Sequence, residues 1–144
     1  MEIAMKLLTV TIPSYNSQEY MRHAIESVLV GGEDIEILIV DDGSSDNTLS
    51  IAQEYEQKFP TIVRAIHKEN GGHGSAVNTG IQNATGLFFK VLDSDDWFDE
   101  ASLKKILHFI HYIVNYKTVN QTGVIMNIIN YLEKNGIKRA VYVI

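Results

Sequence analysis

Three carboxylates within four residues are the part of this sequence best suited to chemistry. They are Asp93, Asp95 and Asp96, in the run Asp93-Ser94-Asp95-Asp96 that follows an apolar stretch. Closely spaced carboxylates repel one another unless a cation lies between them. Mg²⁺ and Mn²⁺ typically take one or two carboxylates together with phosphate oxygens. The alternative is a helix cap, because Asp and Ser are also good N-cap residues. Spacing alone leaves both interpretations open.

A second acidic group, Asp41-Asp42-Gly43, follows the unbroken apolar run from Ile35 to Val40. An aspartate directly after a strand can accept a hydrogen bond from a base N–H or from a ribose hydroxyl, and this favours a functional role for Asp41. For Ser44, Ser45 and Asp46, a turn followed by a helix cap is the better interpretation.

A glycine-rich loop from Asn70 to Gly74 leads into a predicted helix. Backbone N–H groups at a helix N-terminus bind phosphate well, and Lys68 and His73 could assist. The loop does not match G-x-G-x-x-G or the P-loop pattern. Tyr15 could stack on a base or simply pack in its loop, whereas we expect core packing for Trp97 and Phe98.

Alternating strand and helix patterns must position these groups. Apolar, β-branched runs predict strands over Lys6 to Ile12 (ended by Pro13), Ile35 to Val40, Thr61 to Ile66, and Gly86 to Leu92. Helical spacing predicts intervening helices, the first capped by Ser17, the second by Asp46 or Asn47, and the third near Ser75 to Ala84. Such alternation indicates an α/β fold with a mostly parallel sheet, whose ligands bind beyond the carboxyl ends of the strands. All the polar clusters fall at those ends.

Bulk composition excludes several classes of protein. The net charge of −6 argues against a nucleic-acid partner, because phosphate neutralisation needs clustered Lys and Arg. There are no cysteines, so disulfides and thiolate metal sites are excluded. The sequence contains no run of 18 apolar residues, so it does not predict a membrane span. We expect a cytoplasmic protein, and peripheral association with a membrane is left open.

The pattern changes after residue 101. An amphipathic helix from Ser102 is followed by strand-like runs over Val124 to Ile129 and Ala140 to Ile144. We therefore divide the chain after residue 101, with the predicted α/β domain over residues 1–101 and a helix plus the start of a further region over residues 102–144.

Assembled in order, these segments resemble the inverting glycosyltransferases of family 2, which have the Rossmann-like GT-A fold. The matching pieces cover about the first 100 residues: TVTIPSYN at 9–16, IEILIVDDGSSDNT at 35–48, ENGGHGSAVNTGI at 69–81 and FFKVLDSDDWFD at 88–99. The resemblance implies a nucleotide-sugar donor, most often UDP-linked, bound with Mn²⁺ or Mg²⁺. It also implies a role in polysaccharide biosynthesis. On this resemblance, residues 1–101 would be a nucleotide-sugar and metal-binding α/β domain, and residues 102–144 a helix plus the start of the acceptor-side region of the same fold, truncated before its end.

The resemblance also implies roles for individual residues. Pro13, Tyr15 and Asp41 would surround the base, and Lys68 would lie beside the nucleotide. Asp93 would contact ribose or sugar, and Asp95 would ligate the metal. The loop glycine Gly72 completes the substrate-binding set.

Two features depart from the family pattern. Ala76-Val77-Asn78 stands where many relatives carry Ala-Arg-Asn, and Glu133 is the only carboxylate after Glu100. We therefore expect the catalytic base to be missing from this chain, which would bind donor but transfer sugar weakly or not at all. The acceptor (a saccharide, a lipid-linked glycan or a protein) is not predicted. The alternative hypothesis is a non-catalytic nucleotide-binding or receiver-like signalling module, whose acidic pair should follow the first strand. A sugar nucleotidyltransferase would need a glycine-rich, basic loop there.

Overall fold

The computed structural model describes residues 5–120 and 142–143 of the chain. Within them a parallel sheet forms the centre of the molecule, with strand order β3-β2-β1-β4-β5. Its strands are β1 (Leu8–Ser14), β2 (Ile35–Asp41), β3 (Val63–His67), β4 (Phe88–Val91) and β5 (Tyr142–Val143). The order reverses at β1, since β2 and β3 extend to one side and β4 to the other. Crevices at such reversals are the usual ligand sites of open α/β sheets.

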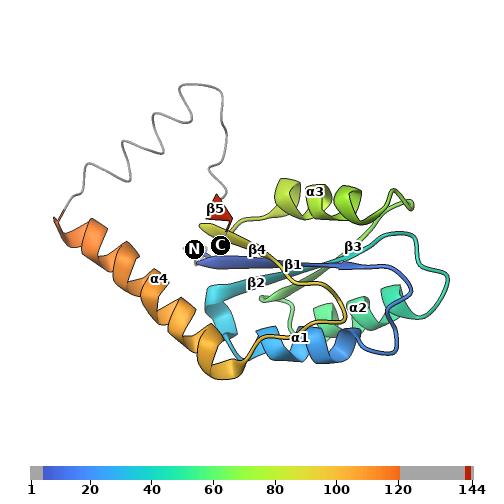
Figure 1. Cartoon of the computed structure of the whole chain (residues 1–144), viewed down its shortest axis with the longest axis horizontal. Coiled ribbons are helices and arrows are strands. Elements are labelled where there is room, and N and C mark those ends of the chain that lie inside the picture. Colours follow the sequence, from blue (N-terminus) through green and yellow to red (C-terminus); the bar gives the residue numbers. More distant parts are fainter. Residues whose placement is uncertain (1–4, 121–141, 144) are drawn as a thin grey trace, which may run out of the picture.

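Helices cover both faces of this sheet (Figure 1). α1 (Met21–Leu29) and α2 (Thr48–Lys58) lie on one face, and α3 (His73–Asn83) lies on the other. A short 3₁₀ helix, η1 (Gly32–Asp34), joins α1 to β2. The fold is thus the α/β arrangement that the sequence predicts.

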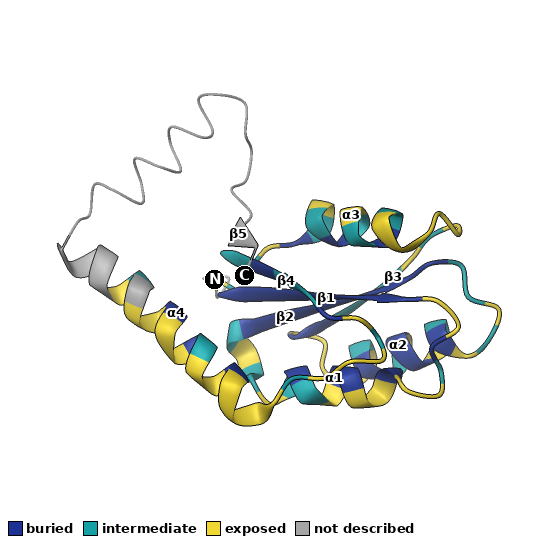
Figure 2. Ribbon diagram, in the orientation of Figure 1, coloured by how far each residue is buried: buried dark blue, intermediate teal, exposed yellow. Residues whose placement is uncertain are grey.

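The core fills both sides of the two central strands, whose residues are all buried (Figure 2). A large apolar cluster joins β1 and β2 to α1, α2 and the start of α4 (Glu100–Asn120), and a smaller one around Leu38 and Phe89 lies under α3. Gly80 of α3 packs so closely on β1 that an added Cβ would lie 2.3 Å from Thr11 Cγ2. This contact holds α3 close against β1.

Several predicted boundaries need correction. Pro13 lies inside β1 instead of ending it, because β2 stays paired with β1 as far as Ser14. Ser17 does not cap α1; its carbonyl accepts from Tyr20 and Met21 N–H, and its side chain bonds elsewhere. Asp46 does bind the start of α2, since its carboxylate accepts from Thr48 N–H at 2.9 Å.

The helix predicted from Ser102 is confirmed as part of α4. Asp99 accepts from Ser102 N–H at 2.9 Å, so the residue that caps this helix lies three positions beyond the run Asp93-Ser94-Asp95-Asp96. The strand predicted over Val124 to Ile129 lies outside the described residues, and the last predicted strand is represented by β5. Within the described part of the chain, no helix is both long and apolar enough to span a bilayer.

Candidate functional site

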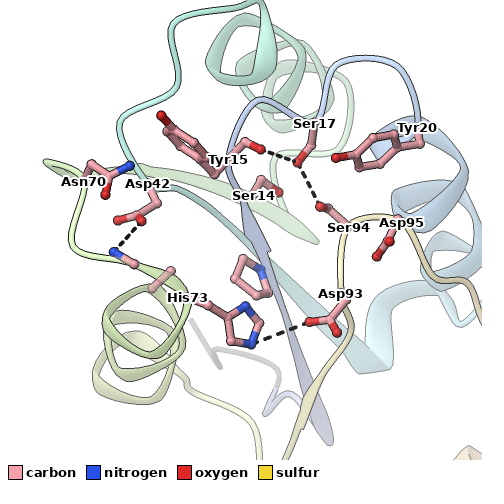
Figure 3. Close-up of a pocket in the computed structure, with 13 residues that line it drawn as sticks. Ser14, Tyr15, Ser17, Tyr20, Asp42, Asn70, His73, Asp93, Ser94 and Asp95 are labelled. Carbon is pink, nitrogen blue, oxygen red and sulfur yellow. Dashed lines mark hydrogen bonds and ion pairs between the residues drawn. The ribbon is translucent and has the colours of Figure 1, made fainter.

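A pocket of about 470 Å³ opens at the carboxyl ends of the strands (Figure 3). Five parts of the chain contribute to it: the end of β1 with the loop after it, the loops after β2, β3 and β4, and the start of α3. It is lined by Pro13, Ser14, Tyr15, Ser17, Tyr20, Asp42, Asn70, Gly72, His73, Ala76, Asp93, Ser94 and Asp95. The structure therefore brings together five of the predicted site residues, namely Pro13, Tyr15, Gly72, Asp93 and Asp95.

Asp42 provides a buried negative charge in this pocket. Only 3% of its surface is exposed. Its Oδ1 accepts from Lys68 Nζ at 2.7 Å and from Gly71 N–H at 2.9 Å, and its Oδ2 accepts from Gly72 N–H at 2.8 Å. Burial by itself raises the pKa of Asp42, but these hydrogen bonds and the charge of Lys68 outweigh it and hold the pKa below its ordinary value. Asp42 is therefore an anion at neutral pH.

Asp41 does not line the pocket, although the sequence favoured it over Asp42. It is the last residue of β2 and is fully buried. Its carboxylate lies 2.7 Å from His67 Nδ1 and accepts from Ser44 N–H at 3.2 Å. Successive residues of an extended chain point in opposite directions, so only one of two adjacent aspartates can face the ligand side. The structure moves the acidic pocket residue of this segment from Asp41 to Asp42.

The glycine-rich loop is arranged around Asp42 rather than around an open anion site. The N–H groups of Gly71 and Gly72 both donate to Asp42, so these donors are engaged and do not form the phosphate cradle that the composition suggested. Gly72 has a φ of 87°, which favours glycine. Lys68 does not line the pocket; its Nζ donates to Asp42 and to the Glu69 carbonyl. Lys68 therefore acts on the pocket through Asp42.

The three aspartates that follow β4 lie in different surroundings. Asp93 and Asp95 line the pocket and are exposed, whereas Asp96 is exposed outside it. His73 Nε2, at the start of α3, lies 3.7 Å from Asp93 Oδ1 across the pocket. Among the described residues, the Asp95 carboxylate has no hydrogen-bond or ion-pair partner. The structure thereby distinguishes Asp95 from Asp96, which spacing alone could not.

A divalent cation fits the side chains present. Asp93 and Asp95 offer exposed carboxylate oxygens, the hard ligands that Mg²⁺ and Mn²⁺ prefer. The described part of the chain contains no group of three metal-ligating side chains. An ion here would therefore draw one or two ligands from the protein and the rest from phosphate or water, as the sequence predicts.

Aromatic side chains flank the polar groups. Tyr15 is 53% exposed beside Asp42 and Asn70, and Tyr20 lies across the pocket beside Ser94 (Figure 3). The core packing expected for Trp97 is wrong, because this side chain is 60% exposed and stacks on His23 with ring centroids 4.6 Å apart. Phe98, the next residue, does pack against the core.

Sequence reasoning missed Asp42, Ser17, Ser94 and Tyr20 as pocket residues. β2 is buried along its whole length, so no alternation of apolar and polar residues indicates which of Asp41 and Asp42 lines the pocket. The pairing of Ser17 with Ser94 joins positions 77 residues apart, and no local pattern predicts it.

Comparison with known proteins identifies the class. The chain matches the model of "Glycosyl transferase family 2" over residues 9–137 and belongs to that family. It is 41% identical over 133 residues to an uncharacterized glycosyltransferase of Rickettsia bellii, covering 90% of this chain and 18% of that protein. It is 38% identical over 104 residues to the minor teichoic acid biosynthesis protein GgaB of Bacillus subtilis, covering 70% and 12% respectively. The chain thus spans less than a fifth of the length of these two relatives.

A solved structure is similar as well. Residues 1–349 of S. aureus TarS, in complex with UDP-GlcNAc, match with a TM-score of 0.64 and 30% identity, covering 73% of this chain and 31% of that one. The fold is therefore that of GT-A glycosyltransferases, as the resemblance implied, and the family assignment favours a transferase over the receiver-like alternative.

Proposed function

We propose that this chain forms the donor-binding part of an inverting glycosyltransferase that uses a nucleoside diphosphate sugar linked to UDP. One observation carries the proposal: a buried anion at Asp42, an exposed ring at Tyr15 and two exposed carboxylates at Asp93 and Asp95 share one pocket at the strand ends. The structure of TarS with UDP-GlcNAc supports it, because that protein has the same fold.

The nucleoside would bind at the Asp42 side of the pocket. The Asp42 carboxylate is fixed by three donors and remains ionised, so it can accept a hydrogen bond from an N–H of the base. Tyr15 offers an exposed ring face on which a base can stack. Pro13 and Gly72 shape the walls, and Lys68 keeps Asp42 charged.

The diphosphate and sugar would bind at the Asp93 side. A chain with net charge −6 repels an anionic donor unless a cation intervenes. We assign Asp95 as a ligand of Mn²⁺ or Mg²⁺, which would neutralise charge on the departing diphosphate when bound. Asp93 would accept from ribose or sugar hydroxyls, and His73, 3.7 Å from it, would donate to an oxygen of the donor.

The sugar would leave the diphosphate as an acceptor hydroxyl attacks the anomeric carbon from the opposite side. A base must remove the proton of that hydroxyl. We assign no base and no acceptor, and the candidates for the acceptor remain a saccharide, a lipid-linked glycan or a protein.

Isothermal titration calorimetry with UDP tests this proposal, because two neighbouring aspartates give a matched pair of variants. Asp95→Ala should abolish the Mn²⁺-dependent part of UDP binding, since it removes a carboxylate that lines the pocket. Asp96→Ala removes the same charge one residue away and outside the pocket, so it should leave the affinity within about twofold of the parent. UDP binding that needs no metal, or equal effects of the two substitutions, would refute the assignment of Asp95.

A further inference from the structure

Ser94, the residue between the two pocket carboxylates, has a side-chain partner far away in the sequence. The Oγ atoms of Ser17 and Ser94 lie 2.8 Å apart and share a hydrogen bond (Figure 3). Only 1% of the surface of Ser17 is exposed, and Ser94 is half-buried. This bond ties the loop after β4 directly to the loop after β1.

Ser17 is itself held firmly from its other side. Its N–H donates to Thr48 Oγ1 at 2.8 Å, and the Thr48 hydroxyl donates to Asp46 Oδ1 at 2.6 Å. Asp46 Oδ2 accepts from Gln18 N–H at 3.3 Å, which closes the connection. Thr48 is fully buried at the start of α2. Ser17 therefore anchors Ser94 to a rigid part of the sheet edge.

The loop around Ser94 is also held at its two ends, where Leu92 N–H donates to the Thr11 carbonyl at 2.9 Å and Phe98 N–H donates to Ser27 Oγ at 3.0 Å. Between these ends, the side chains of Asp93 and Asp95 have few contacts of their own. Asp93 and Asp95 are both exposed, and the only ion pair of Asp93 within the described residues is the 3.7 Å contact with His73. Two carboxylates flanking one residue repel each other, and this favours a spread-out loop. A loop that must be ordered as the ligand binds lowers the affinity, whereas a loop already in place does not.

We propose that Ser94 is a positioning residue, whose hydrogen bond to Ser17 holds Asp93 and Asp95 at the pocket before the donor arrives. The inference rests on the donor-binding function proposed above. It predicts that metal-dependent binding of UDP depends on two hydroxyl groups, although that of Ser17 belongs to a different loop from the carboxylates.

A double-mutant cycle measured by calorimetry with UDP and Mn²⁺ tests the pair. Ser94→Ala and Ser17→Ala should each weaken UDP binding about three- to tenfold, and the double variant should be no weaker than either single one. Ser94→Thr, which keeps the hydroxyl, should retain the affinity. Ser50→Ala is the control, because it removes an exposed hydroxyl that donates to the Asn47 carbonyl at 2.9 Å, outside the pocket.

A disulfide gives a second readout that does not depend on hydrogen bonding. The sequence contains no cysteine, so the double variant Ser17→Cys/Ser94→Cys has a single possible intramolecular bridge. We expect this bridge to form under mild oxidation, because the two Oγ atoms already lie in contact. The oxidised protein should bind UDP and Mn²⁺ about as tightly as the parent, and reduction should weaken binding about threefold or more.

The possible failures distinguish the proposed function from the positioning role of Ser94. A parent chain that binds no UDP with Mn²⁺ would contradict the proposed function. A parent that binds, together with a Ser94→Ala variant of equal affinity, would overturn the positioning role alone. The positioning role would also be overturned if Ser94→Ala weakened UDP binding and Ser17→Ala left it unchanged. That result would indicate that Ser94 contacts the donor directly. An oxidised double-cysteine variant that binds UDP and Mn²⁺ no more tightly than its reduced form would overturn the positioning role too.

Discussion

Replacing Asp42 by Asn alters a buried carboxylate on which three donors converge. Lys68 Nζ and the N–H groups of Gly71 and Gly72 all donate to it. Asparagine has nearly the same shape but only one acceptor oxygen, and its amide group presents further donors. At least one backbone N–H, or the ammonium of Lys68, must therefore lose its acceptor. The substitution should destabilise the fold even with no ligand present.

The size of the effect follows from these contacts. A hydrogen bond to a charged group contributes about 1.5–3 kcal/mol, and a buried donor left without a partner costs a similar amount. Solvent screening reduces the free energy that the Lys68–Asp42 contact contributes, because the Lys68 side chain is 20% exposed. We expect the unfolding free energy to fall by about 2–4 kcal/mol, and Tm to fall by about 5–15 °C. Lys68→Met removes one donor and leaves both backbone bonds, so it should cost about half as much.

The stabilisation that Asp42 gives to the folded protein should decrease as the pH falls. The pKa of Asp42 in the folded protein lies below its ordinary value of 3.8. A carboxyl group with a lowered folded pKa stabilises the protein above its unfolded pKa, and this stabilisation is lost as the pH falls through the folded pKa. The difference between the parent and Asp42→Asn should stay constant from pH 7 to about 5 and shrink below about pH 4.

Urea denaturation followed by circular dichroism, at several pH values between 3 and 7, measures this difference. Asp41→Asn is a useful comparison, since it removes an adjacent buried carboxylate that is bonded to His67 outside the pocket. A loss below about 0.5 kcal/mol for Asp42→Asn at pH 7, or a difference that grows on acidification, would refute the reasoning about the Asp42 contacts.

Two further predictions concern packing and stacking. Gly80→Ala should destabilise the fold by about 1–3 kcal/mol or more in thermal unfolding, because the new Cβ would meet Thr11 at 2.3 Å. Gly74→Ala in the same helix meets nothing within 4 Å and should be neutral or slightly stabilising; equal losses would contradict the close contact of α3 with β1. Tyr15→Ala should weaken UDP binding about fivefold or more, whereas Tyr15→Phe should keep most of it, since the ring face is retained. An effect of equal size for both would exclude stacking.

The fold was largely predictable because its signals are local. Apolar β-branched runs predict the first four strands. Acidic and glycine-rich segments mark the ends of these strands, and helical spacing predicts the helices that connect them. The errors lie where two elements meet. Pro13 continues β1 because a neighbouring strand pairs with it at Val40, and Ser17 bonds to Ser94 instead of capping α1. Val40 and Ser94 are distant in the sequence from the residues they contact, so the local sequence around Pro13 and Ser17 does not predict these contacts.

The sequence predicted where the pocket lies, but not which contacts its residues make. Parallel topology brings the strand ends together, so Tyr15, Asp93 and Asp95 were expected there. Which of Asp41 and Asp42 lines the pocket depends on the direction of each side chain; the structure places Asp42 there, and a contact of Asp41 with the base stays a prediction. The composition of the glycine loop suggested a phosphate site, but it could not reveal that Asp42 already engages the Gly71 and Gly72 N–H groups. The division at residue 101 stays a prediction.

The most direct test of donor binding in this pocket is an NMR titration of backbone amides with UDP in the presence of Mg²⁺. We predict that the largest shifts occur at Asp42, Gly72 and Asp93 to Asp95, which line the pocket. Substituting Mn²⁺ should broaden the signals of Asp93 to Asp95 most. Thr85, which donates to Glu36 near the amino ends of the strands, should not shift. Shifts confined to that opposite edge, or none at saturating UDP and metal, would contradict the account.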